Sequence, residues 1–250
     1  MQQEGIDTFF KERMAPLGVT EDNNKILLHN DEGDWPIVKD TVSKIFDHDD
    51  KGNIVITYYT IAGEAIMYED MSVKNKKKRF YKTKRLREPK GDMKYQMPKG
   101  VKPYPWFHPN TVQAFAERQK IETIYLTEGV FKAWAAGEEG VHVVGLSSIT
   151  HYAGEDGGLH RDIRYLIEFC DVDNVVVLWD GDCLDVSRKG IQTREEATRR
   201  PFGFFNAAKK IRKLVMKAEY EKTRSNPRIY FAYNKSESLE GSPKGLDDMI

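Results

Sequence analysis

The sequence lacks the features that would mark a membrane or secreted protein. No apolar run approaches the ~18 residues of a membrane-spanning helix, and the first residues lack the basic-then-apolar order of a signal peptide. Of its two cysteines, neither Cys170 nor Cys183 has a Cys or His partner at the spacing of a zinc site. We therefore expect an intracellular, cytoplasmic protein with no structural zinc and no membrane partner.

The chain also lacks an excess of either charge. Lys+Arg and Asp+Glu both number 39 in 250 residues, so net charge alone does not indicate a class of partner. Hydrophobic residues make up 40% of the chain, which is enough to form the core of one large or two small domains. The charges are nevertheless segregated along the sequence.

The segregated charges form a basic stretch at positions 74–102, where 13 Lys and Arg residues face only two acids. Aromatic residues are interleaved with them, so the stretch offers cations for phosphates and ring faces for bases. We expect it to contact nucleic acid through Lys82, Lys84, Arg85, Arg87, Lys94, Tyr95 and Lys99. The alternative is a solvated loop, above all for the lysines at 76–78.

The region before position 109 has the character of β-structure. Runs of β-branched and aromatic residues at 53–63 and 64–68, separated by Ala62 and Gly63, fit a hairpin or meander. A short helix is expected around 6–14. We therefore predict a basic, β-containing subdomain at 1–108 that binds a template strand.

After Pro109 the pattern changes to alternating strands and helices. Strands are expected at 123–128, 141–146, 175–179 and 228–233. Helices are expected at 110–120, with Asn110 as the cap, and at 129–139, 159–170 and 204–218. This order predicts an α/β domain at 109–250, with a roughly four-stranded parallel sheet flanked by helices and joined by right-handed crossovers.

Two of the expected strands end in carboxylates. The first ends at Glu128, and the third is followed by Asp180 and Asp182. Ligands collect at the carboxyl ends of strands in open α/β sheets, and hard divalent cations prefer carboxylate oxygens. We therefore expect a Mg²⁺ or Mn²⁺ site, the alternative being a set of helix caps and solvated turn residues.

Motifs at three successive strand ends resemble the Toprim domain of primases, topoisomerases and certain nucleases. They are Thr127-Glu128-Gly129, Gly145-Leu146-Ser147-Ser148 and Asp180-Gly181-Asp182. The segments Lys94-Tyr95-Gln96-Met97-Pro98 and Trp106-Phe107-His108 are similar to the region that precedes this domain in bacterial-type primases. Lys244-Gly245-Leu246-Asp247-Asp248 resembles a closing motif of phage- and plasmid-borne primases and primase–helicases. The resemblance covers about residues 50–250.

The resemblance implies a metal-dependent nucleotidyltransferase, a DNA primase that makes RNA primers for phage, plasmid or mobile-element replication. It implies single-stranded DNA and nucleoside triphosphates as substrates, with a replicative helicase as a candidate partner. The implied catalytic residues are Glu128, Asp180 and Asp182, and Asp247 and Asp248 join them as implied metal ligands. Lys132, Ser147 and Lys244 are the candidates for binding nucleotide phosphates.

Several roles stay open at this point. Lys132 stands where bacterial primases usually have a further acid, so it either contacts a triphosphate or reduces the number of metals held. Glu128 either completes the metal site or acts as a general base. Ser147 either binds phosphate at the strand end or belongs to a plain turn. The same residues also suit a metal-dependent nuclease or a catalytically inactive DNA-binding module of a replication complex.

Overall fold

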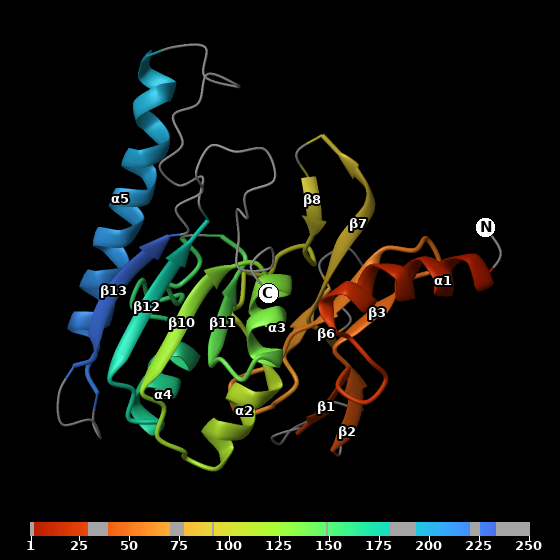
Figure 1. Cartoon of the computed structure of the whole chain (residues 1–250), viewed down its shortest axis with the longest axis horizontal. Coiled ribbons are helices and arrows are strands. Elements are labelled where there is room, and N and C mark those ends of the chain that lie inside the picture. The colour runs from red at the N-terminus through yellow and green to blue at the C-terminus, as the bar shows by residue number, and fades with distance from the viewer. Residues whose placement is uncertain are drawn as a thin grey trace. The chain divides into compact units, whose positions relative to one another are not determined.

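The computed structural model describes residues 3–29, 40–70, 78–91, 93–148, 150–180, 194–220 and 226–233 (Figure 1). The chain forms two units, Met1–Tyr104 and Pro105–Ile250. The division falls before Trp106, Phe107 and His108, which the sequence analysis assigned to the first region. None of the described helices is both long enough and apolar enough to cross a membrane.

The first unit begins with α1 (Gln3–Met14), followed by a 3-10 turn (Ala15–Leu17), and is otherwise built of antiparallel strands. Its main sheet has the order β3-β4-β7-β8, with bounds Phe46–His48, Ile54–Thr57, Lys82–Lys90 and Met93–Gln96. Two further strand pairs join β1 (Lys25–Leu28) to β2 (Thr41–Lys44), and β5 (Met67–Glu69) to β6 (Lys78–Phe80).

The hairpin or meander expected from the runs at 53–63 and 64–68 forms only as a turn, because the strands of the two runs pair with other strands. β4 pairs with β3 and β7, whereas β5 pairs with β6. A tight turn does form, in which the Thr60 N–H donates to Glu64 O at 3.0 Å, but only an isolated bridge between Tyr59 and Ala65 closes it. The aromatic side chains of this segment, including the fully buried Tyr59, fill the core of the first unit instead of extending a ladder.

The second unit contains a five-stranded sheet with the order β13-β12-β10-β11-β9. Four strands are parallel, with bounds Thr123–Glu128 (β10), Val143–Leu146 (β11), Asn174–Trp179 (β12) and Arg228–Tyr233 (β13). This confirms the expected α/β class and its parallel strands. The structure adds β9 (Trp106–Phe107), which pairs antiparallel with β11 at the edge and is completely buried.

The helices of the second unit are α2 (Pro109–Ala116), α3 (Val130–Glu138), α4 (Arg161–Phe169) and α5 (Arg194–Lys217). In Figure 1, α3 lies in front of the sheet and α4 behind it. The core between these layers is aliphatic and aromatic, and its fully buried side chains include Leu126, Trp134, Leu166, Val177 and Ile211. The α5 helix begins ten residues before the expected 204, since 194–200 are polar helix formers without an apolar period.

The expected N-cap of the first helix in the second unit is wrong by two residues. His108, not Asn110, is the cap, and its Nδ1 accepts the Asn110 N–H at 3.2 Å. Pro109 then occupies the first helical position, where its missing N–H costs nothing. Asn110 instead donates from Nδ2 to Gly137 O at 2.9 Å, which ties α2 to the end of α3.

Candidate active site at the carboxyl edge of the parallel sheet

Glu128 and Asp180 are delivered to the same edge of the sheet by neighbouring strands. β10 and β12 are parallel, with Thr127 opposite Leu178, so both strands end at the same level. Glu128 is the last residue of β10, and Asp180 follows the last residue of β12. Both side chains are partly exposed. The structure thus brings together two of the predicted carboxylates.

These two strands also flank the point where the strand order of the sheet reverses. β10 continues through α3 to β11 on one side, whereas β12 continues through α5 to β13 on the other side. With right-handed crossovers, helices that leave in opposite directions cover opposite faces and open a crevice between the strand ends. Ligands of open α/β sheets bind outside the carboxyl ends of the strands at such a reversal, and Glu128 and Asp180 lie at the ends of the two strands that flank it.

Two glycines let α3 begin directly after Glu128. Gly129 has φ 103° and ψ 145°, a conformation that side chains rarely adopt, and its N–H donates to Leu146 O at 2.7 Å. At Gly145 of β11, a Cβ would lie 3.0 Å from Gly129 O and 3.1 Å from Ala133 Cβ. Gly145 therefore makes room for the first turn of α3 against the neighbouring strand, which fixes the direction of the side chains on that turn.

Lys132, in this first turn, contacts Asp180. Its Nζ donates to Asp180 Oδ1 at 2.5 Å, and the two side chains are only 17% and 28% exposed. A cation is unfavourable at the positive end of a helix, and the nearby carboxylate of Asp180 offsets this unfavourable energy for Lys132. Lys132, predicted to touch a triphosphate or to reduce the number of metals held, thus lies at this edge and contacts one oxygen of Asp180.

The donor atoms at this edge fit a hard divalent cation. Mg²⁺ is commonly held by one or two carboxylates together with waters and substrate phosphates, and Glu128 and Asp180 supply two carboxylates. Within the described ranges, no three His, Cys, Asp or Glu side chains form a group that could hold a metal ion. The other predicted acids, Asp182, Asp247 and Asp248, lie outside those ranges, as does Lys244.

Ser147 is the third predicted residue at this edge. Leu146 is paired with Glu128, so Ser147 follows β11 directly beside the end of β10. Its side chain is exposed. The position leaves both predicted roles, phosphate contact and plain turn, open.

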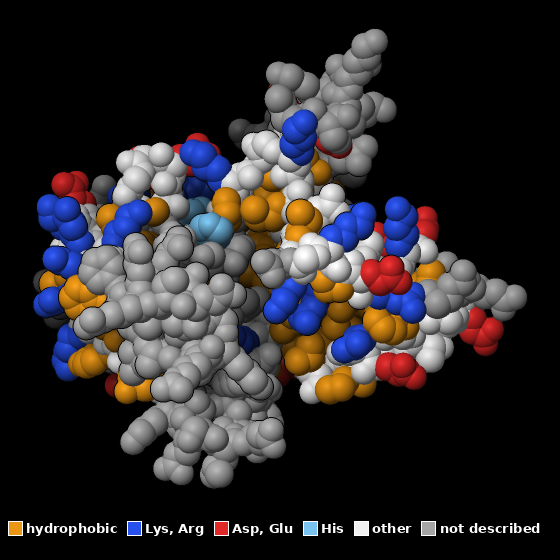
Figure 2. Space-filling view, turned by 90° about the horizontal axis from the view of Figure 1, so that it is seen from above, with side chains coloured by type: hydrophobic (Ala, Val, Ile, Leu, Met, Phe, Trp, Pro, Cys, Tyr) orange, Lys and Arg blue, Asp and Glu red, His pale blue; other side chains and the backbone are white. Residues whose placement is uncertain are grey.

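The basic residues of the first unit lie on β7 and β8, and their register divides them between two faces. Side chains alternate along a strand. Arg85 pairs with Tyr95 and with the buried Ile54, so these three share one face. Lys84 pairs with Gln96 on the opposite face. The view from above shows Lys and Arg side chains standing among exposed hydrophobic side chains (Figure 2).

By the same alternation, Lys82 and Lys94 lie on the face of Lys84, and Lys99 lies in the turn after β8. The register shifts between Arg85 and Lys90, so alternation does not place Arg87. The face of Arg85 carries a stacked pair, because its guanidinium lies 5.7 Å from the Tyr95 ring centre and the ring is 41% exposed.

Arg87 and Lys84 also contact other residues of the first unit. The Arg87 guanidinium lies 4.6 Å from the centre of the Phe9 ring. Lys84 Nζ lies 3.1 Å from Asp49 Oδ2. Burial raises the pKa of Asp49, but hydrogen bonds from Asn53, Lys84 and the turn backbone outweigh it and lower that pKa to about 2. Lys84 is therefore bound to the fold, whereas the side chains of Arg85 and Tyr95 are exposed.

Sequence reasoning missed the buried cluster that positions α3 from its other end. His108 Nε2 lies 3.1 Å from Glu138 Oε1, and its ring lies 5.0 Å from that of Trp134. Desolvation lowers the pKa of His108, which favours the neutral imidazole. The only local signal was Gly137, a glycine near the end of an otherwise regular helix.

Comparisons with known proteins add a distant similarity to a solved structure. No family model matches the sequence, and no curated protein matches it. Among solved structures, the chain is similar to one described as "Structure of the DnaG catalytic core", with a TM-score of 0.48 and 8% sequence identity. The match covers 98% of this chain and 68% of that chain. At this score and identity, functional inference rests on the geometry of the site.

Proposed function

We propose that the chain is a metal-dependent nucleotidyltransferase of the primase type, with its active site at the carboxyl edge of the parallel sheet. One observation carries the proposal. Glu128 and Asp180 stand on either side of the strand-order reversal, with Lys132 bonded to Asp180. Two carboxylates and a cation at this position suit a phosphate-bearing substrate that binds together with a hard cation.

In this proposal Glu128 and Asp180 hold Mg²⁺ or Mn²⁺, and the resemblance adds Asp182, Asp247 and Asp248. A bound divalent cation would neutralise the charge that develops on a transferring phosphoryl group. Lys132 exchanges its bond to Asp180 for one to a phosphate oxygen, so the ammonium orients the nucleotide. Ser147 and Lys244 supply further phosphate contacts.

The resemblance to the Toprim domain supports the choice of primer synthesis and of its setting. The substrates we propose are single-stranded DNA and nucleoside triphosphates, in phage, plasmid or mobile-element replication in the cytoplasm. The basic residues of the first unit would guide the template strand. A replicative helicase is the proposed partner.

A second candidate, a nucleic-acid-binding module without catalysis, is favoured by the ion pair itself. Lys132 Nζ occupies Asp180 Oδ1. If this contact persists when nucleotide is present, it competes with a metal ion for the same carboxylate.

The substitution Asp180→Asn tests the proposal because it keeps the side-chain size and removes the charge. Primer synthesis from ribonucleotides on single-stranded DNA should fall about a hundredfold or more, since an amide is a poorer ligand for a hard cation. Asp173→Asn is the matched control at the amino end of the same strand, where Asp173 pairs with Lys120 at 3.1 Å on the surface. It should keep the wild-type rate.

Each outcome of this assay has a clear meaning. Synthesis that survives Asp180→Ala combined with Asp182→Ala contradicts the metal site. Degradation of the DNA in place of synthesis indicates the nuclease. DNA binding without turnover supports the second candidate. Lys132→Met then assigns the lysine: a raised KM for the nucleotide indicates phosphate contact, and a raised metal affinity indicates competition for Asp180.

A further inference from the structure

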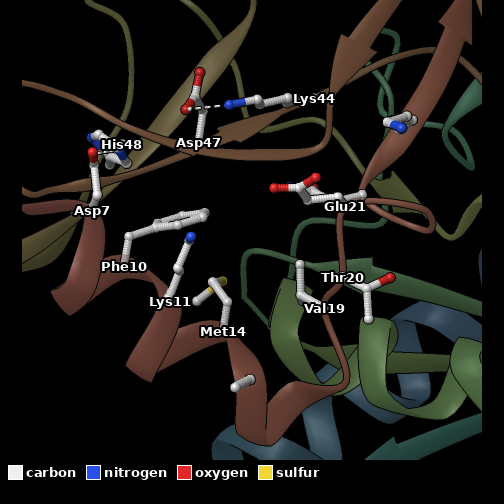
Figure 3. A pocket seen from close by; sticks show the side chains of 13 residues that line it. Asp7, Phe10, Lys11, Met14, Val19, Thr20, Glu21, Lys44, Asp47 and His48 are labelled. Atoms are coloured by element: carbon white, nitrogen blue, oxygen red, sulfur yellow. Dashed lines mark ion pairs between the residues drawn. The ribbon is translucent and has the colours of Figure 1, made fainter.

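We propose that a pocket in the first unit binds a nucleoside phosphate. The pocket lies between α1, the segment that follows it and the strands β1 to β3 (Figure 3), and has a volume of about 720 Å³. That volume is in the range of small-molecule sites. All of its lining residues lie between positions 7 and 48, and none belongs to the candidate active site. The inference therefore goes beyond the proposed function.

Three lysines from three different elements line the pocket. Lys11 comes from α1, Lys25 from β1 and Lys44 from β2. Lys25 and Lys44 are directly opposite each other in the antiparallel ladder. Like charges in this arrangement destabilise a strand pair. An anionic group bound beside the two ammonium groups would remove this repulsion.

The acids that line the pocket equal its lysines in number, but of these lysines only Lys44 forms an ion pair within the described residues. Lys44 Nζ lies 3.6 Å from Asp47 Oδ1, and Asp7 Oδ1 lies 3.0 Å from His48 Nε2. Within the part of the chain that the structure describes, Lys11 and Lys25 form no ion pair. Two cations are thus available to a ligand, which favours a phosphate over a neutral or cationic group.

The side of the pocket formed by α1 is apolar. Met14 is 3% exposed, and Phe10 and Val19 are half-buried beside it. The Phe10 ring lies 5.3 Å from the His48 ring at an angle of 57°, and the bond from His48 to Asp7 holds that second ring. A flat aromatic group of a ligand can pack against this wall, as a nucleobase does on protein rings.

Glu21 supplies an acceptor opposite the helix. Figure 3 shows its carboxylate and the ammonium of Lys11 pointing into the space from opposite sides. An acceptor here suits a ribose hydroxyl or an exocyclic amino group. A simple inorganic anion is not the best ligand, because it would leave the apolar wall uncovered. A purely apolar ligand is not the best one either, because it would leave Lys11 and Lys25 without an anion. A nucleoside phosphate satisfies the lysines, the wall and the acceptor together.

This ligand chemistry has two sources, a free nucleotide and a nucleotide unit of a single strand. NMR of the full chain labelled at methionine methyl groups separates them, because Met14 reports on the pocket wall and Met14→Leu assigns its signal. ATP and a short single-stranded DNA are the two probes. A saturable shift of the Met14 signal with ATP alone indicates the free nucleotide, and a shift with the DNA indicates the strand. No shift with either probe at about 5 mM overturns the proposal.

Variants connect the signal to the pocket. Lys11→Glu with Lys25→Glu changes two exposed side chains, so the fold should persist, and the affinity should fall about tenfold or more. Lys51→Glu, an exposed lysine of the same unit outside the pocket, is the matched control and should leave the affinity unchanged. Equal affinity in the double variant, or equal binding of adenosine and AMP, contradicts the phosphate contact.

The test is independent of the proposed primase activity. Asp180→Asn should lower primer synthesis about a hundredfold or more and leave the Met14 shift unchanged. If the Met14 shift is lost in Asp180→Asn, the pocket is not a separate site and the inference is wrong. If the shift persists while no variant affects synthesis, the pocket stands and the proposed active site is wrong.

Discussion

The two units place their charged residues in opposite ways. In the second unit, parallel strands end at one edge, so Glu128 and Asp180 lie at neighbouring strand ends although they are far apart in sequence. In the first unit, antiparallel strands separate neighbours, so Lys84 and Arg85 face opposite sides of the sheet. Charged residues that are neighbours in sequence are therefore not always neighbours in space within a sheet. Acids at the ends of adjacent parallel strands predict a spatial cluster better.

The two units also hold their key side chains by different means. In the second unit, close packing around glycines positions α3 between Gly145 and His108. In the first unit, a hydrogen-bonded carboxylate, Asp49, fixes a turn and Lys84. The packing around the glycines of the second unit should therefore be most sensitive to added side-chain volume. The stabilisation by the Asp49 carboxylate in the first unit should be most sensitive to pH.

The largest effect is expected from added volume at Gly137. A Cβ there would overlap the ring of His108, which is buried and bonded to Glu138 and Asn110. We expect Gly137→Ala to lower the free energy of unfolding by about 2–3 kcal/mol, since the ring must move and lose its partners. Urea unfolding followed by tryptophan fluorescence measures this, because Trp106 and Trp134 are fully buried in this unit.

Gly203→Ala is the matched control for Gly137→Ala. Gly203 also lies in a helix, α5, but a Cβ there meets nothing within 4 Å. The substitution should stabilise the protein by about 0.5–1 kcal/mol, because alanine has the higher helix propensity. Equal effects at Gly137 and Gly203 would show that the second unit is not held by close packing.

The next largest effect is expected from acid acting on the first unit. The pKa of Asp49 is lowered from 3.8 to about 2, so its carboxylate stabilises the fold above pH 3.8. This contribution is lost as the pH falls through 2, and it amounts to about 2 kcal/mol. Hydrogen exchange of first-unit amides near pH 7, 4 and 2 follows the loss. Asp49→Asn should be less stable at pH 7 and should lack this pH dependence.

The second unit should respond to acid at a higher pH. Burial lowers the pKa values of His108, His142 and His151 below the ordinary 6.5. A lowered histidine pKa stabilises the fold above 6.5, and that contribution is lost as the pH falls through the lowered value. Amides of the second unit should therefore lose protection before those of the first. The reverse order would contradict the contrast between the two units.

The parallel part of the fold could be predicted because each strand is a short apolar run with a clear end. Strand β9 could not, since Trp106 and Phe107 stand between prolines without alternation. The pairing of β4 with β3 and β7 depends on contacts made far along the chain, which local patterns of residues do not contain. The cap at His108 was missed because histidine is not a common N-cap residue.

The candidate site was predictable to a similar degree. Glu128 and Asp180 follow from where their apolar runs stop, but the adjacency of β10 and β12 and the reversal of strand order are properties of the sheet. The bond between Lys132 and Asp180 joins two elements that have no sequence signal for each other. The pocket of the first unit was missed because its lining residues form no motif.

The smallest effect is expected from separating two neighbouring basic residues. Arg85→Glu should weaken single-stranded DNA binding several-fold and reduce the salt slope by about one, because the side chains of Arg85 and its neighbour Tyr95 are both exposed. Lys84→Glu should mainly lower the stability of the first unit, because it places two carboxylates side by side at Asp49. Fluorescence anisotropy at several salt concentrations and urea unfolding of both variants measure the two effects. If Lys84→Glu weakens DNA binding as much as Arg85→Glu without a loss of stability, then both faces contact the strand, and the register does not decide which lysines and arginines bind it.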